Sequence, residues 1–195
     1  MKTLIIIRTY PVDDYISYLC YLSWKKVLPD AKFIFFAQNE NDPPPGKYKW
    51  IVETGEDILI RGYCCNFGGR SHVEAYIEGL KRIDVSGYDK IICSDADITV
   101  HKNPLEHDFE FGGVRHVGNE RVYSGQCLIF SRWVFQKLIQ YPHYESLFNE
   151  FINDGYRSIS DDTIFSWLAT SWTDKTFGFW DKDYWSHDKF YYLKK

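Results

Sequence analysis

The sequence lacks long hydrophobic runs, a basic stripe, internal repeats and low-complexity tracts, and these absences exclude several classes of protein. The apolar run near its start, residues 4–7, is far too short for a signal peptide or a membrane span. Acidic and basic residues are interspersed and give a net charge of −4, so the sequence gives no sign of a nucleic-acid-binding surface, although a local patch could still bind a nucleic acid as substrate. The five cysteines are odd in number and show no Cys-x-x-Cys spacing, which argues against a disulfide framework and a zinc site. We therefore expect a reduced, cytoplasmic chain.

What the sequence does contain is enough apolar material for one folded domain. Hydrophobic residues make up 45% of its 195 residues and aromatic residues 18%. Trp and Tyr are concentrated toward the C-terminus, where their rings can fill a core or line a sugar or base pocket. No long linker interrupts the chain, so we expect a single domain across residues 1–195.

Strands and helices alternate along the first half of the chain. Strands are expected at residues 3–9, 32–37 and 49–52 and in the segment ending at Asp95, with helices at residues 14–28 and 71–83. The proline-rich residues 38–46 should form a loop, and residues 56–69 should be irregular or partly helical. This alternation predicts an α/β fold, in which a mostly parallel sheet carries helices on both faces.

The pattern changes after residue 104. Strands compatible with antiparallel pairing are expected at residues 109–117 and 126–130, and helices at residues 131–140, 144–154 and 161–169. Beyond residue 170 the chain is aromatic and charged, and we expect it to wrap the surface.

The most informative segment is a short apolar run that ends in two aspartates, Asp95 and Asp97. It predicts a buried strand that delivers two carboxylates to its C-terminal end, where ligands collect in open α/β sheets. Two neighbouring carboxylates are costly unless a positive group joins them, and a divalent cation does so with hard oxygen ligands. A phosphate ester bound to magnesium or manganese, such as a nucleotide diphosphate, is the natural ligand.

A simpler interpretation of this motif stays open. The two aspartates can merely cap a turn at the end of a strand. A second Asp-x-Asp, formed by Asp181 and Asp183, also occurs, but no apolar run precedes it, so the context favours Asp95 and Asp97.

Four features occur in an order that resembles a known family. The first strand leads into Arg8, a helix that starts near Arg70 precedes the Asp-x-Asp strand, and an acidic pair opens a helix at residues 160–165. Between them, residues 123–130 read Tyr-Ser-Gly-Gln-Cys-Leu-Ile-Phe, similar to an Asn-Ser-Gly and apolar strand that lines a sugar pocket. Together these features, over roughly residues 1–170, resemble GT-A glycosyltransferases of the glycogenin-like and galactosyltransferase-like group. Small viral and phage enzymes of this fold have comparable size, which would place the chain in a host cytoplasm.

The resemblance implies transfer of a sugar from a nucleotide-diphosphate sugar, with UDP as the expected carrier, to an acceptor hydroxyl. It implies that Asp97 binds Mn²⁺ or Mg²⁺ directly and that Asp95 meets the ribose or a metal-bound water. A late histidine often supplies a third ligand, for which His187 is the best candidate. The other five histidines stay open as alternatives, namely His72, His101, His107, His116 and His143. Residues 1–104 would bind the nucleotide, and residues 105–195 would bind a glycan, protein or modified nucleic-acid acceptor.

Further donor contacts are implied at the ends of other elements. Arg70 would lie near a helix N-terminus, which favours phosphate, although a solvated arginine there is an equal alternative. Tyr10 is expected to stack on or flank the base. The residues expected to bind nucleotide or donor, besides Asp95, are Arg8, Thr9, Tyr10, Arg70, Ser124 and Gly125.

Asp161 and Asp162 open the helix expected at residues 161–169. They can be ordinary cap residues that complement the helix dipole. They can also face the acceptor, where one carboxylate takes the hydroxyl proton, and we favour Asp162 for that role. The family more often has Glu-Asp or Asp-Gln-Asp here, and Tyr123 replaces the family's Asn, so the donor sugar and the stereochemical outcome stay open.

Two other functions compete with glycosyl transfer. Asp95 and Asp97 also fit the nucleophile and the acid/base of a haloacid-dehalogenase-like phosphatase, with Asp161 and Asp162 as its distal magnesium pair. That family normally carries its motif near the start of the chain and has Gly where Ile98 stands. A non-catalytic sugar- or nucleotide-binding module is the third possibility, although binding alone does not need both acidic pairs.

Overall fold

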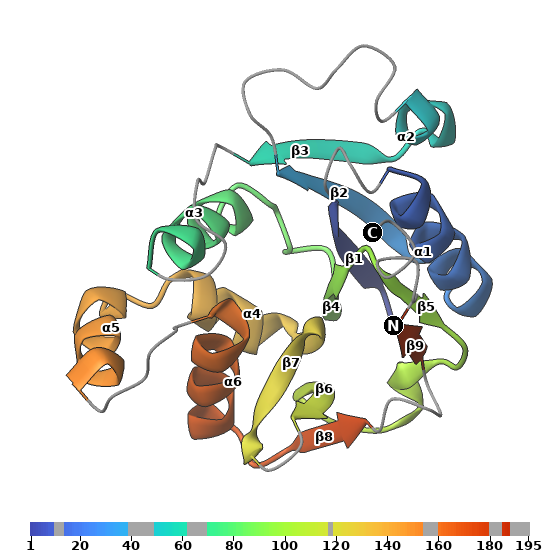
Figure 1. Ribbon diagram of the computed structural model, residues 1–195. Helices are drawn as coiled ribbons and strands as arrows, with labels where there is room; N and C mark the ends of the chain where they lie inside the picture. Colours follow the sequence, from blue (N-terminus) through green and yellow to red (C-terminus); the bar gives the residue numbers. More distant parts are fainter. Residues whose placement is uncertain are drawn as a thin grey trace, which may run out of the picture.

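A seven-stranded mixed sheet forms the centre of the molecule, with the strand order β3-β2-β1-β4-β7-β6-β8 (Figure 1). The computed structural model describes residues 1–9, 14–38, 49–61, 70–116, 119–153, 160–179 and 185–187. The sheet strands are β1 (Thr3–Thr9), β2 (Lys32–Gln38), β3 (Asp57–Arg61), β4 (Lys90–Asp95), β6 (Phe111–His116), β7 (Asn119–Ser131) and β8 (Thr176–Phe179). The strands β3, β2, β1 and β4 are parallel to one another. β7 is antiparallel to β4 and β6, and β8 is parallel to β6. The predicted α/β fold is confirmed.

Helices cover both faces of this sheet, and α1 lies on the opposite side from α3 to α6 (Figure 1). The helices are α1 (Asp14–Val27), α2 (Lys49–Thr54), α3 (Arg70–Leu80), α4 (Arg132–Ile139), α5 (Tyr144–Asn153) and α6 (Asp161–Trp172), with a 3₁₀ turn at Pro104–Glu106. In β1, Leu4 and Ile6 pack with α3, α4 and α6, whereas Ile5 and Ile7 pack with α1. A strand buried on both faces reads as an unbroken apolar run, which explains the start of this sequence.

The strand order reverses between β1 and β4. The chain runs from β1 outward to β2 and β3, then crosses back and places β4 on the other side of β1. Side chains at the carboxyl ends of β1 and β4 therefore border a topological switch point, where open α/β sheets bind ligands.

A small second sheet follows directly. β5 (Ile98–Val100) pairs antiparallel with β9 (Trp185–His187), and Ile98 is in register with His187. The late part of the chain thus returns to the segment that follows Asp97.

Two predictions for the first half of the chain were wrong. Residues 49–52 belong to helix α2, because a short apolar run does not distinguish a strand from a buried helix. Residues 57–61, expected to be irregular or helical, form strand β3 against β2.

The end of the chain was also mispredicted. We expected it to wrap the surface, but it contributes β8 to the large sheet and β9 to the small one. Phe179 lies in the core and is 1% exposed. β8 pairs with β6, which lies more than 60 positions earlier in the sequence, so no local sequence pattern predicted this strand. Among the residues described, no helix is long and apolar enough to cross a membrane.

Candidate active site

Arg8, Asp95 and Asp161 meet at the switch point. Arg8, the second-to-last residue of β1, pairs with Asp95 at the end of β4, and Asp161 begins α6. Arg8 Nη2 lies 2.5 Å from Asp95 Oδ1, and Arg8 Nη1 lies 2.5 Å from Asp161 Oδ2. One guanidinium therefore joins two carboxylates from opposite halves of the chain.

Two stacked aromatic rings pack beside this cluster. The Arg8 guanidinium carbon lies 5.1 Å from the centroid of the Tyr76 ring, which stacks on Phe165 with a centroid separation of 5.8 Å. Tyr76 comes from α3 and is 1% exposed. Burial raises the pKa of Tyr76 well above its ordinary value, so this ring stays neutral. Cation–π contact with a desolvated ring adds to the electrostatic support of the guanidinium.

Negative charge exceeds positive charge in the cluster. Burial raises the pKa of Asp95 to about 6, the Arg8 guanidinium opposes that rise, and the nearby Asp97 and Asp161 carboxylates add to it. Asp95 thus has two carboxylates and one guanidinium close enough to affect its charge. A further cation would relieve this imbalance.

Helix α1 holds the strand end that carries these acids. Cys20 Sγ donates to the Asp95 carbonyl at 3.4 Å, and Ser94 Oγ donates to the same oxygen at 3.0 Å. Trp24 Nε1 donates to Ser94 Oγ at 3.1 Å, and the Val100 amide donates to Ser23 Oγ at 3.0 Å beyond the turn. The Asp-x-Asp turn is thus held on both sides by one helix.

The donor set at this turn fits a divalent cation. Asp95 and Asp97 offer hard carboxylate oxygens, and both residues are partly exposed. The residues described contain no group of three or more His, Cys, Asp and Glu arranged to hold a metal ion. The backbone register puts His187 opposite Ile98, one residue beyond Asp97, so the predicted third ligand is close in the fold.

The two acids that open α6 have different environments. Asp161 is 6% exposed and turns toward Arg8. Asp162 is partly exposed, and its Oδ1 accepts hydrogen bonds from Ser160 Oγ and, at 2.8 Å, from the Thr163 amide. Asp161 therefore belongs to the buried cluster, and Asp162 lies at the rim of the helix start.

The other predicted donor-site residues are spread around the same edge. Thr9 is fully buried, and its hydroxyl lies 2.5 Å from Ser17 Oγ of α1, so its side chain joins the strand to the helix. Arg70 is the first residue of α3. Ser124 and Gly125 lie in β7, next to Tyr123, whose amide donates to Ser166 Oγ of α6 at 3.0 Å. Tyr10, Asp181 and Asp183 lie outside the described residues.

Sequence reasoning missed Tyr76 and the shared use of Arg8 by two acids. The spacing of Val73, Tyr76, Ile77 and Leu80 marks the core face of α3, but this signal indicates only burial. A guanidinium over the ring could not be inferred from it.

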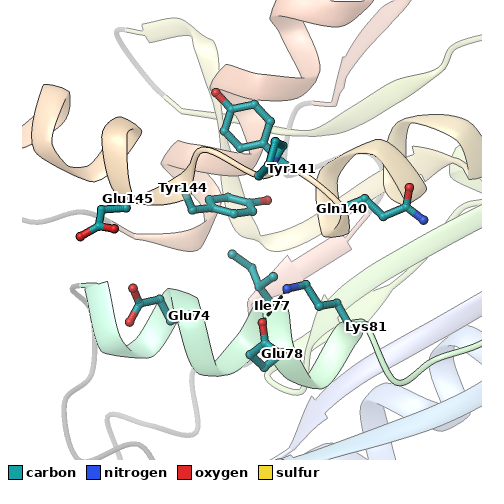
Figure 2. A pocket seen from close by; sticks show the side chains of 9 residues that line it. Glu74, Ile77, Glu78, Lys81, Gln140, Tyr141, Tyr144 and Glu145 are labelled. Atoms are coloured by element: carbon teal, nitrogen blue, oxygen red, sulfur yellow. Dashed lines mark hydrogen bonds and ion pairs between the residues drawn. The ribbon is translucent and has the colours of Figure 1, made fainter.

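A groove of about 530 Å³ lies elsewhere, between α3 and the start of α5 (Figure 2). Tyr141 and Tyr144 line one side, and Ile77 lies on the other. Lys81 contacts Glu78 at 2.6 Å within it. None of the clustered residues at the switch point lines this groove, so it is separate from the candidate active site.

Comparisons with known proteins give structural neighbours only. No family model and no curated protein matches the chain. The glycosyltransferase GlyE of Streptococcus pneumoniae TIGR4 superposes with a TM-score of 0.56 at 13% identity, over 92% of this chain and 45% of GlyE. The galactosyltransferase LgtC, solved with donor and acceptor sugar analogues, gives 0.54 at 14% identity, over 89% of this chain and 72% of LgtC. S. aureus TarS 1–349 superposes with a TM-score of 0.57 at 15% identity, over 95% of this chain and 60% of TarS 1–349.

These likenesses show that the chain has a GT-A glycosyltransferase fold. The chain spans about half the length of GlyE.

Proposed function

We propose that this chain is a glycosyltransferase that moves a sugar from a nucleotide-diphosphate sugar, a UDP-sugar, to an acceptor hydroxyl. Residues 1–104 would bind the nucleotide and residues 105–195 the acceptor. The observation that carries the proposal is the Asp95-Ala96-Asp97 turn at the switch point of a GT-A sheet, with an excess of negative charge around it.

The residues at the turn suit a diphosphate held through a divalent ion. Asp97 would bind Mn²⁺ or Mg²⁺, Asp95 would support it, and His187 would complete the protein ligands. When bound, the ion would neutralise charge on the leaving diphosphate. Arg70, at the start of α3, would lie where a helix N-terminus favours phosphate.

The remaining donor and acceptor roles follow the same edge of the sheet. Tyr10 and the backbone around Thr9 would flank the base and ribose, and Ser124 and Gly125 would face the sugar. Asp162 would accept the proton of the acceptor hydroxyl in an inverting reaction. In a retaining reaction it would instead position donor or acceptor.

UDP and Mn²⁺ together should stabilise the folded chain. A ligand that binds only the folded form adds about 2.7 kcal/mol to the free energy of unfolding at a hundredfold excess over its dissociation constant. Thermal or urea unfolding with UDP and Mn²⁺ measures this shift, and UDP with excess chelator is the control. An equal shift with and without chelator would contradict metal-dependent nucleotide binding.

Replacing Asp162 with Asn should lower sugar transfer by at least about a hundredfold, the low end for a lost general base. Stability should change little, because an Asn oxygen can accept the same bonds from Ser160 and the Thr163 amide. Steady-state kinetics with UDP-binding titrations would show the loss in turnover alone. Asp174→Asn, just after the same helix, is the matched control. Unchanged turnover in Asp162→Asn would leave Asp162 as a cap residue only.

A further inference from the structure

We propose that Arg8 and Asp161 are a positioning pair that acts through Asp95. The pair fixes the orientation of Asp95, and thereby the placement of the Asp-x-Asp turn relative to the start of α6. This inference rests on the proposed function for its catalytic meaning, while the ordering it describes can be measured without sugar transfer.

Burial separates the three side chains into an inner pair and an outer acid. The side chains of Arg8 and Asp161 are each 9% exposed, whereas that of Asp95 is 27% exposed. Tyr76 covers the guanidinium from α3. A ligand that approaches from solvent can therefore reach Asp95 more readily than the inner pair.

The geometry also requires arginine in particular. Arg8 uses two different terminal nitrogens, each 2.5 Å from a carboxylate oxygen, to link β4 with α6. A planar guanidinium presents such donors in a rigid fork, whereas a lysine ammonium is a single point charge on a flexible stem. Arg8→Lys therefore keeps the positive charge and loses the link.

This link joins the two sides of the proposed reaction. Asp95 belongs to the strand end that would hold the diphosphate, and Asp161 is the immediate neighbour of Asp162 at the acceptor side. Because misplacement of reacting groups by about 1 Å can cost about a hundredfold in rate, a loosened link should reduce turnover.

The test compares two variants in hydrogen exchange and in kinetics. Arg8→Lys keeps the charge. The double variant Arg8→Met/Asp161→Leu replaces the inner pair by apolar side chains, and such a replacement of a buried ion pair often leaves the stability of a protein unchanged or higher. In both, amide exchange across residues 94–98 should rise by about tenfold or more, while exchange in β2 stays at the wild-type rate. With a UDP-sugar, kcat should fall by about a hundredfold with a smaller change in KM.

Lys32→Met is the matched control, because it removes an ion pair with Glu56, at 3.2 Å, that lies outside the cluster. It should leave exchange across residues 94–98 and kcat unchanged. Wild-type exchange in that segment in a folded Arg8→Lys or double variant would overturn the positioning role. A wild-type chain that transfers no sugar would instead refute the proposed function, and the exchange result would still decide the positioning role.

Discussion

Replacing Asp97 with Asn is expected to abolish sugar transfer while leaving the fold intact. The substitution removes an anionic oxygen ligand and hardly changes the side-chain volume. Because a bound metal supplies several kcal/mol of charge stabilisation, turnover should fall by at least about a thousandfold, or about 4 kcal/mol. Steady-state transfer assays with Mn²⁺, together with a urea unfolding curve, measure the two effects separately.

The second Asp-x-Asp provides the control for this experiment. Asp183→Asn makes the same chemical change in a motif without a preceding apolar strand, and it should retain turnover. Full activity of Asp97→Asn, or of the wild type in excess chelator, would refute metal-dependent transfer at Asp95 and Asp97.

Replacing Arg8 with Met is expected to give a large loss of stability. It leaves the buried carboxylate of Asp161 without the guanidinium that it contacts at 2.5 Å, and it removes the same support from Asp95. Breaking a buried pair by removing one partner typically costs about 3–5 kcal/mol. Urea unfolding should therefore show a midpoint far below that of the wild type.

Two further variants show whether that loss of stability comes from an unpaired buried charge. Arg8→Met/Asp161→Leu should recover most of it, because no charge of the pair then stays buried. Lys32→Met should cost less than about 1 kcal/mol, because Lys32 and Glu56 form a partly exposed pair. A loss in Arg8→Met as small as that in Lys32→Met would show that the buried bridge contributes little.

Local sequence patterns predicted the parts of the fold that local physics determines. The apolar run before Asp95 gave strand β4, and its paired acids gave the candidate site, because burial and strand-end chemistry are both visible in neighbouring residues. The start of α6 was predicted for the same reason, from two acids in its first turn.

Long-range pairing was beyond these patterns. β8 depends on β6, and β9 on β5, so the final segment looked like a surface wrap when its residues were considered alone. Arg8 was expected to contact the nucleotide because it follows the first strand, and its two carboxylate partners became visible only in the structure. Its nucleotide contact stays a prediction, and the contacts described here give it a supporting position under Asp95.

The bridge between Arg8 and Asp161 also bears on the order of folding. It joins residues 153 positions apart, so the entropy of closing that long loop must be overcome before the bridge can form. Pairing of β1 with β2 involves much closer residues and needs no part of α6. A partly folded chain can therefore contain the parallel strands of the first half while its acidic cluster is unassembled. The candidate active site should accordingly assemble late during folding and come apart early during unfolding.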